Sequence, residues 1–179
     1  VGVTYLGIDH DLFAPQDSEE TLRIRKKYGL PDHFILYPAA TLPHKNHERL
    51  FYAFRKVKEH FKDFKLVLIG ARDKGWGRVK AQILESELQE KDVFFLGWIP
   101  FEDVPFVYCA SELFAFPSLY EGFGMPVLEA MGCGIPVVCS RIEPLQEVGG
   151  DAAMFVDPYD SYSVAEGILD VLNDARLRG

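Results

Sequence analysis

Two glutamates and four glycines lie in the segment SLYEGFGMPVLEAMGCG, residues 118–134. Gly122 and Gly124 remove side chains where the backbone turns, so main-chain N–H groups can approach a bound molecule closely. Pro126 is typical of the first turn of a helix, and the free N–H groups at such a helix start favour an anion such as a diphosphate. The segment therefore indicates an anion-binding turn that opens a helix.

Glu121 and Glu129 flank this turn, the first within it and the second on the helix, about one turn beyond the proline. A carboxylate repels phosphate, so we expect each to accept hydrogen bonds from hydroxyl groups, such as those of a ribose and a hexose on either side of a diphosphate. The alternative is a pair of solvated surface charges. The apolar neighbours of Glu129 favour a binding site over that alternative.

A second polar segment, AATLPHKNH, spans residues 39–47 and opens another helix. Lys45 stands at its start, where an ammonium group suits a phosphate; an exposed lysine beside an Asn46 helix cap is the alternative. His44 and His47 are three residues apart, but the segment offers no third metal ligand, so we expect surface or substrate-lining histidines and no metal.

Two glycine-bearing segments complete the candidate motifs. In LIGARDKGWG, residues 68–77, Gly70 allows the backbone to pass close to a ligand, although an ordinary loop is equally consistent with the pattern. In GWIP, residues 97–100, Trp98 is suited to form the wall of a base-binding pocket or to pack between domains.

Apolar runs alternate with helix-period segments and place these motifs in a fold. Strands are expected over residues 34–40, 65–69, 93–96, 113–116, 135–139 and 153–156, and helices over about 47–61, 78–90, 104–110, 125–132 and 161–173. Nearly continuous apolar strands that alternate with helices predict an α/β fold, a doubly wound, Rossmann-like parallel sheet of about six strands. Ligands bind such sheets beyond the carboxyl ends of the strands, where all four motifs fall.

The 179 residues suffice for one domain, which we assign to residues 34–179. Residues 1–33 are interpreted as an interdomain linker and leading segment outside the core. They include a charged, mostly exposed helix at Ser18–Tyr28.

Composition narrows the function classes. The net charge of −8 and the lack of a Lys/Arg cluster argue against nucleic-acid binding, and no apolar run reaches the roughly 18 residues of a membrane span. The three cysteines form no CxxC pair and are expected to be buried free thiols in a reducing compartment. The first strand is followed by AATLPH where a dinucleotide-binding protein has GxGxxG, and the P-loop pattern is absent.

Three segments together resemble family 4 of the retaining glycosyltransferases, which have the GT-B fold. The resemblance is carried by GVTYLGIDHDLFAP at residues 2–15, PAATLPHKNHERL at residues 38–50, and FLGWIPFEDVPFVYCASELFAFPSLYEGFGMPVLEAMGCGIPVV at residues 95–138. The first resembles the link from the N-terminal domain, the second the Lys-bearing loop, and the third the core signature with two glutamates.

The resemblance implies roles for individual residues in binding a nucleoside-diphosphate sugar. Lys45 and Glu121 are the expected catalytic residues, with Lys45 on the diphosphate leaving group, Glu121 beside the donor sugar and Glu129 on the ribose hydroxyls. The expected donor-binding set is Thr41, Lys45, Gly70, Trp98, Ile99, Glu121, Gly122, Phe123, Gly124, Met125 and Glu129.

One position departs from the family pattern. Many members carry an arginine five residues before the lysine as a second phosphate ligand, and here Ala40 occupies that position. Either the hydroxyl of Thr41 and nearby amides compensate, or the phosphate site is weaker, or another cation takes the place of the arginine.

The resemblance implies that the chain is the C-terminal donor-binding domain of a glycosyltransferase, and that the N-terminal acceptor domain is missing. The expected reaction moves a hexose, mannose or glucose, from a UDP-, GDP- or ADP-linked donor to a glycan, lipid or small-molecule acceptor. We expect no metal and no activity from this piece alone. A nucleotide-sugar epimerase of GT-B type and a non-catalytic nucleotide-sugar-binding module are the alternatives.

The resemblance also suggests where the protein works. The expected location is the cytoplasm, and peripheral association with the cytoplasmic face of a membrane, through the missing domain, is left open. The sequence does not decide the donor base, the sugar, the acceptor or the oligomeric state.

Overall fold

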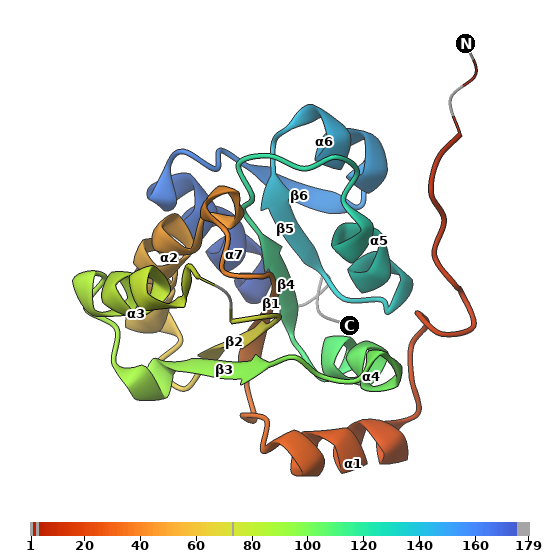
Figure 1. The fold of residues 1–179 in the computed structure, drawn as a ribbon, viewed down its shortest axis with the longest axis horizontal. Helices are drawn as coiled ribbons and strands as arrows, with labels where there is room; N and C mark the ends of the chain where they lie inside the picture. Colours follow the sequence, from red (N-terminus) through yellow and green to blue (C-terminus); the bar gives the residue numbers. More distant parts are fainter. Residues whose placement is uncertain (1, 3, 73, 175–179) are drawn as a thin grey trace.

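A single parallel sheet of six strands forms the centre of the chain (Figure 1). In this computed structural model the described residues are 2, 4–72 and 74–174. The strands are β1 (Phe34–Pro38), β2 (Lys65–Ile69), β3 (Val93–Gly97), β4 (Leu113–Phe116), β5 (Val137–Ser140) and β6 (Ala153–Val156). Their order is β3-β2-β1-β4-β5-β6, with every neighbouring pair parallel. The prediction of a doubly wound, Rossmann-like sheet is confirmed.

Helices cover both faces of the sheet (Figure 1). The α-helices are α1 (Ser18–Tyr28), α2 (His47–His60), α3 (Trp76–Glu85), α4 (Val104–Cys109), α5 (Met125–Gly132), α6 (Glu143–Gly149) and α7 (Ser161–Asn173). Helix α2 packs against α3 and α7 on one side, whereas α5 packs against α6 on the other and α1 lies against α4. The strands are thereby enclosed, which explains why they read as continuous apolar runs.

The core lies where the predicted apolar faces meet. Strands β4 and β5 are buried along their whole length, and only the last residue of β1 is partly exposed. On α2, Leu50, Phe54 and Val57 are fully buried and Phe61 packs beside them, as the helical spacing predicted.

Several predicted boundaries need correction. Helix α3 begins at Trp76, two residues early, and ends at Glu85 because Glu87 adopts a left-handed backbone with φ of 63°. Strand β1 ends at Pro38 and β5 begins at Val137, so both are shorter than predicted at one end. Helix α6 was not predicted at all.

The leading segment contributes three buried side chains to the core, contrary to the prediction that residues 1–33 lie outside it. The side chain of Ile24 is fully buried, and those of Phe13 and Leu30 are 3% and 9% exposed. Arg25 fastens α1 by donating to the main-chain oxygen of Ala110 at 2.7 Å. The segment's role as an interdomain link stays a prediction, and its residues 1 and 3, like residues 175–179 at the far end, lie outside the described residues.

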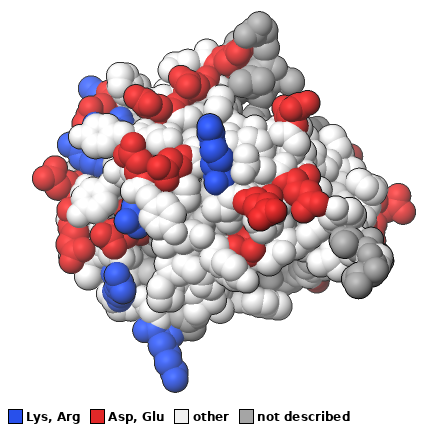
Figure 2. All heavy atoms as spheres, turned by 90° about the horizontal axis from the view of Figure 1, so that it is seen from above, with Lys and Arg blue, Asp and Glu red and all other residues white. Residues whose placement is uncertain are grey.

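The surface and the helices bear on possible partners. Figure 2 shows basic side chains scattered among acidic ones on the face seen from above, without a broad basic patch there. Among the described residues, no helix combines the length and the apolar character that a membrane span needs.

Candidate active site

The two loops that carry the predicted catalytic residues touch at the carboxyl edge of the sheet. They follow β1 and β4, which are neighbours at its centre. Lys45 Nζ lies 2.6 Å from Glu121 Oε1, and both side chains are largely buried, at 15% and 13% exposure. The Leu119 amide also donates to the His44 oxygen at 2.7 Å. The structure therefore brings Lys45 and Glu121 together, although 76 residues separate them.

Lys45 is held by its main chain as well as by its charge. It ends a short 3-10 helix, Pro43–Lys45, directly before α2. The buried hydroxyl of Tyr37 donates to its carbonyl oxygen, and its ammonium group lies 5.0 Å from the centre of the Phe116 ring. The lysine is thus fixed beside the start of α2, as the sequence predicted.

Asn46 does not act as the predicted helix cap. It occupies the N-cap position of α2 with a left-handed φ of 62°, but its side chain points elsewhere. Its Nδ2 donates to the carbonyl oxygens of Pro117 at 2.8 Å and Pro158 at 2.7 Å. The amide therefore ties together the loops after β1, β4 and β6, because the left-handed backbone turns the side chain towards the interior.

A cavity of about 360 Å³ opens at the same edge, between the loops that follow β1, β2 and β3 and the start of α5. Four predicted donor-binding residues line it, namely Gly70, Trp98, Ile99 and Glu129. Ala40, the position of the departure from the family pattern, lines it too. Among the residues that the structure describes, the other predicted donor-binding residues do not line the cavity. Pro126 at the start of α5 does line it, as Ala40 does in the loop after β1.

Sequence reasoning missed three residues that line this cavity, Phe101, Val104 and Tyr108. They belong to the 3-10 turn Phe101–Asp103 and to α4, the two elements that follow β3 along the chain. The GWIP motif lies directly before these elements and could have drawn attention to them. No local sequence pattern, however, indicates which face of α4 lies against the cavity.

Glu129 enters the cavity from α5 and is bound by Tyr108. The Tyr108 hydroxyl donates to Glu129 Oε2 at 2.9 Å. Burial raises the pKa of Glu129 above its ordinary value, and the bond from Tyr108 opposes that rise. A half-buried carboxylate with one fixed donor is suited to accept further hydrogen bonds from a ligand.

The glycines of the site differ in what the fold requires of them. Gly124 has a left-handed φ of 108°, and a Cβ there would collide with Leu145 of α6. At Gly70, with φ of 142°, a Cβ would lie 2.6 Å from the Ala39 oxygen. At Gly122 the space within 4 Å is open. The fold therefore explains Gly70 and Gly124, whereas the space beside Gly122 is left for a ligand or solvent.

Two further predicted residues are buried. The Thr41 side chain is 2% exposed. His47 is 3% exposed and its ring centre lies 5.1 Å from that of Tyr37, so of the two predicted positions, surface or substrate-lining, the surface position is wrong for His47. Within the described residues, no group of three or more His, Cys, Asp or Glu residues is arranged to hold a metal ion.

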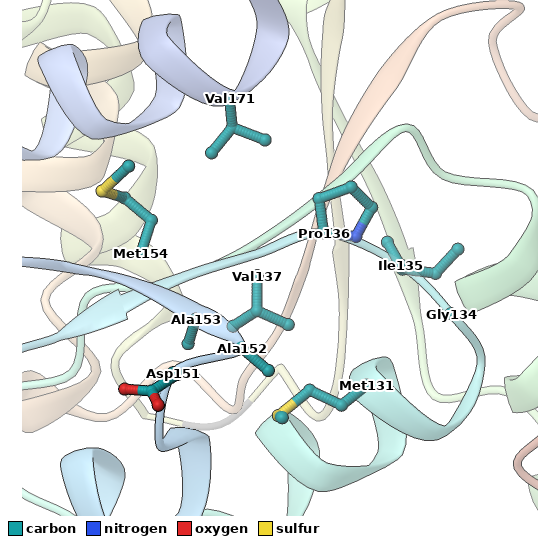
Figure 3. Close-up of a pocket in the computed structure, with 10 residues that line it drawn as sticks. All are labelled: Met131, Gly134, Ile135, Pro136, Val137, Asp151, Ala152, Ala153, Met154 and Val171. Atoms are coloured by element: carbon teal, nitrogen blue, oxygen red, sulfur yellow. The ribbon is translucent and has the colours of Figure 1, made fainter. Parts of the chain in front are cut away.

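A second cavity, of about 440 Å³, lies at the opposite edge of the sheet, where β5 and β6 begin (Figure 3). Met131, Pro136, Met154 and Val171 make most of its lining apolar, and Asp151 supplies one carboxylate. None of the predicted site residues lines this cavity.

Solved glycosyltransferase structures share the fold described above. HepE from Anabaena, in complex with UDP and glucose, superposes with a TM-score of 0.84 at 25% identity, over 97% of this chain and 48% of that one. The family model for glycosyl transferases group 1 matches residues 20–179. The chain therefore belongs to the glycosyl transferases group 1 family.

Several relatives of known description are mannosyltransferases. O-antigen chain mannosyltransferase B of Escherichia coli is 39% identical over 93% of this chain and 44% of its own length. A GDP-mannose-dependent phosphatidylinositol monomannoside mannosyltransferase of Mycolicibacterium smegmatis is 30% identical over 95% of this chain and 46% of its own. The chain spans less than half the length of these two relatives.

Proposed function

We propose that this chain is the donor-binding domain of a retaining, family 4 glycosyltransferase that transfers mannose from a nucleoside diphosphate to a glycan or lipid acceptor. The observation that carries the proposal is that the Lys45–Glu121 pair and the Glu129 cavity lie at the same edge of the sheet. The mannosyltransferase relatives support the choice of sugar.

In this proposal the cavity receives the nucleoside. Glu129 accepts hydrogen bonds from the ribose, and Trp98 and Ile99 frame the base. Ala40 and Gly70 leave the floor open, because neither carries a side chain beyond Cβ. The HepE complex contains UDP and the Mycolicibacterium relative is GDP-mannose-dependent, so uridine and guanosine are both candidate bases.

The diphosphate and the sugar lie between the two loops in this proposal. Lys45 and the amides of Gly122–Met125, at the start of α5, bind the diphosphate and stabilise the charge that builds up as it leaves. Lys45 then exchanges Glu121 for phosphate, which frees the Glu121 carboxylate to bind the sugar hydroxyls. Because fixed cations and amides take up the charge, no metal is needed.

The acceptor requires a second domain in this proposal. Transfer needs the acceptor hydroxyl within about 3–3.5 Å of the sugar carbon, in a cleft that excludes water. This chain supplies one wall of that cleft. It should therefore bind nucleoside diphosphates but not transfer sugar.

Calorimetry on the purified chain tests the proposal. We expect one of GDP, UDP and ADP, and the matching mannose or glucose donor, to bind with the same affinity in EDTA as without it. We expect no sustained transfer to any acceptor. Failure of all these nucleotides to bind would refute the proposed function. Transfer at enzyme-like rates would show that a complete active site lies within these residues.

A further inference from the structure

Tyr108 is a buried phenol in the wall of the cavity at the carboxyl edge of the sheet. It lies on α4, lines the same cavity as Glu129, and donates to Glu129 Oε2 at 2.9 Å. Glu129 lies on α5, so this hydrogen bond joins two helices across the wall of the proposed nucleoside site.

The ring of Tyr108 is clamped between two buried aromatic side chains. Phe114 of β4 stacks on it, with the ring centres 5.6 Å apart and the planes inclined by 26°. Phe13 meets it edge-on at 6.1 Å. Tyr108 itself is 1% exposed, so the position of its hydroxyl is set by the core and not by a ligand.

Glu129 benefits from such a partner because its carboxylate lies among apolar groups. Burial raises the pKa of Glu129, and the hydrogen bond from Tyr108 lowers it. Burial also raises the pKa of Tyr108 well above its ordinary value, so the phenol remains a donor near neutral pH. Among the described residues, the titratable groups that face Glu129 are Tyr108 and the thiol of Cys133, and apolar side chains and main chain form most of the remaining cavity lining.

We propose that Tyr108 is a positioning residue for donor binding: by holding Oε2 of Glu129, it fixes the carboxylate so that Oε1 accepts hydrogen bonds from the ribose. This inference rests on the proposed function, in which Glu129 binds the ribose hydroxyls. Tyr108 itself need not touch the nucleotide.

Tyr108→Phe removes the hydroxyl and keeps the ring. GDP, UDP and ADP are compared with their 2′- and 3′-deoxy counterparts by calorimetry on the wild-type chain and the variant. The wild-type chain should prefer the ribose form by about tenfold or more, the scale of a hydrogen bond to a charged group. In Tyr108→Phe the ribose form should bind about five- to tenfold more weakly and the deoxy form nearly unchanged, so that the preference largely disappears. A purely structural role would weaken both forms equally.

The pH dependence gives an independent readout. Ribose binding requires ionised Glu129, so the affinity should fall as the pH drops through the pKa of that carboxyl. Because the Tyr108 bond lowers this pKa, the midpoint of the loss should move to higher pH in Tyr108→Phe.

Tyr28→Phe is the matched control, because the Tyr28 hydroxyl also donates to a carboxylate, that of Asp103, outside the cavity lining. That variant should keep both the wild-type preference and the wild-type midpoint.

Three results would overturn either the positioning role of Tyr108 or the proposed function on which it rests. An unchanged preference and midpoint in folded Tyr108→Phe would overturn the positioning role alone. A wild-type chain that binds no nucleotide, or shows no ribose preference, would overturn the proposed function beneath it. If the variant does not fold, NMR of the wild-type chain should detect a slowly exchanging Tyr108 hydroxyl proton close to Glu129; its absence would also overturn the positioning role.

Discussion

The two edges of the sheet each carry a cavity and a largely buried lysine–carboxylate contact, but the residues around these features differ. The amino-edge cavity (Figure 3) is the larger, about 440 Å³ against about 360 Å³, and the lining of each cavity is mostly apolar. At the carboxyl edge, Glu129 and the start of α5 line the smaller cavity, and the Lys45–Glu121 pair lies at the same edge outside its lining. Convergent polar groups at strand ends, and not volume, therefore distinguish the candidate site.

The lysine–carboxylate contacts at the two edges also differ. At the amino edge, Asp92 binds two of them, Lys58 at 3.0 Å and Lys65 at 3.3 Å. Partial burial would raise the pKa of Asp92, but these lysines bring it below its ordinary value. The group joins the end of α2 to β2 and to the turn before β3. Within the part of the chain that the structure describes, Lys45 by contrast has one carboxylate at hydrogen-bond distance, that of Glu121, which a ligand can replace.

The largest effect is expected from removing the carboxyl-edge lysine. In a full-length enzyme, Lys45→Ala should lower turnover by about 10²–10³-fold, the usual loss when one donor to a developing anion is removed. Affinity for the intact donor should change less, because the charge on the diphosphate grows as the bond to the sugar breaks. Steady-state kinetics with the mannose donor measures both.

Lys58→Ala is the matched control, because the Lys58 side chain is 14% exposed and that of Lys45 15%. It should lower the unfolding temperature and leave turnover within about twofold. A change in the Michaelis constant alone would make Lys45 a ground-state ligand and weaken the contrast between the edges.

A smaller loss is expected from Glu129→Ala. Nucleoside diphosphate binding should weaken by about 1–3 kcal/mol, because the ribose loses a hydrogen bond to a buried charged group. Titration calorimetry gives the difference, and Glu166→Ala, which removes an exposed glutamate from α7, should leave the affinity unchanged. Wild-type affinity in a folded Glu129→Ala chain would contradict the assignment of the ribose to this cavity.

The smallest predicted effect comes from filling each cavity with the same side chain. Ala40→Phe occupies the carboxyl-edge cavity and should weaken nucleotide binding by about tenfold, whereas Ala152→Phe occupies the amino-edge cavity and should have no effect. Thermal-shift assays with and without nucleotide compare the two variants. Equal losses would mean that the edges are not functionally distinct.

Strong periodic segments made most of the fold predictable. The spacing of Leu50, Phe54 and Val57 marked α2, and continuous apolar runs marked the strands. Helix α6 escaped because it has only seven residues, follows a short polar stretch and buries few side chains, among them Leu145. Helix α6 packs against Gly124 through Leu145. Such a contact joins residues far apart in the sequence, so the local sequence pattern does not reveal it.

The candidate site was predictable where its residues follow strand ends. The sequence singled out Lys45, Glu121 and Glu129 as candidates because each lies in a polar motif that follows an apolar strand, and their roles stay predictions. Tyr108 was not, because its hydrogen bond crosses 21 residues between two helices and its spacing within α4 resembles that of an ordinary core residue. The buried position of Phe13 was hidden similarly, because single apolar residues in an irregular segment give no periodic signal.

The exposure of Trp98 gives the site an optical signal of its own. The chain has two tryptophans, and their surroundings differ. Trp98 is 76% exposed on the wall of the cavity, whereas the Trp76 ring lies 4.4 Å from that of Phe95 and 4.6 Å from the Arg72 guanidinium. A base that stacks on Trp98 would quench its red-shifted fluorescence and leave the emission of Trp76 as an internal reference. Occupancy of this edge should therefore be readable without a label.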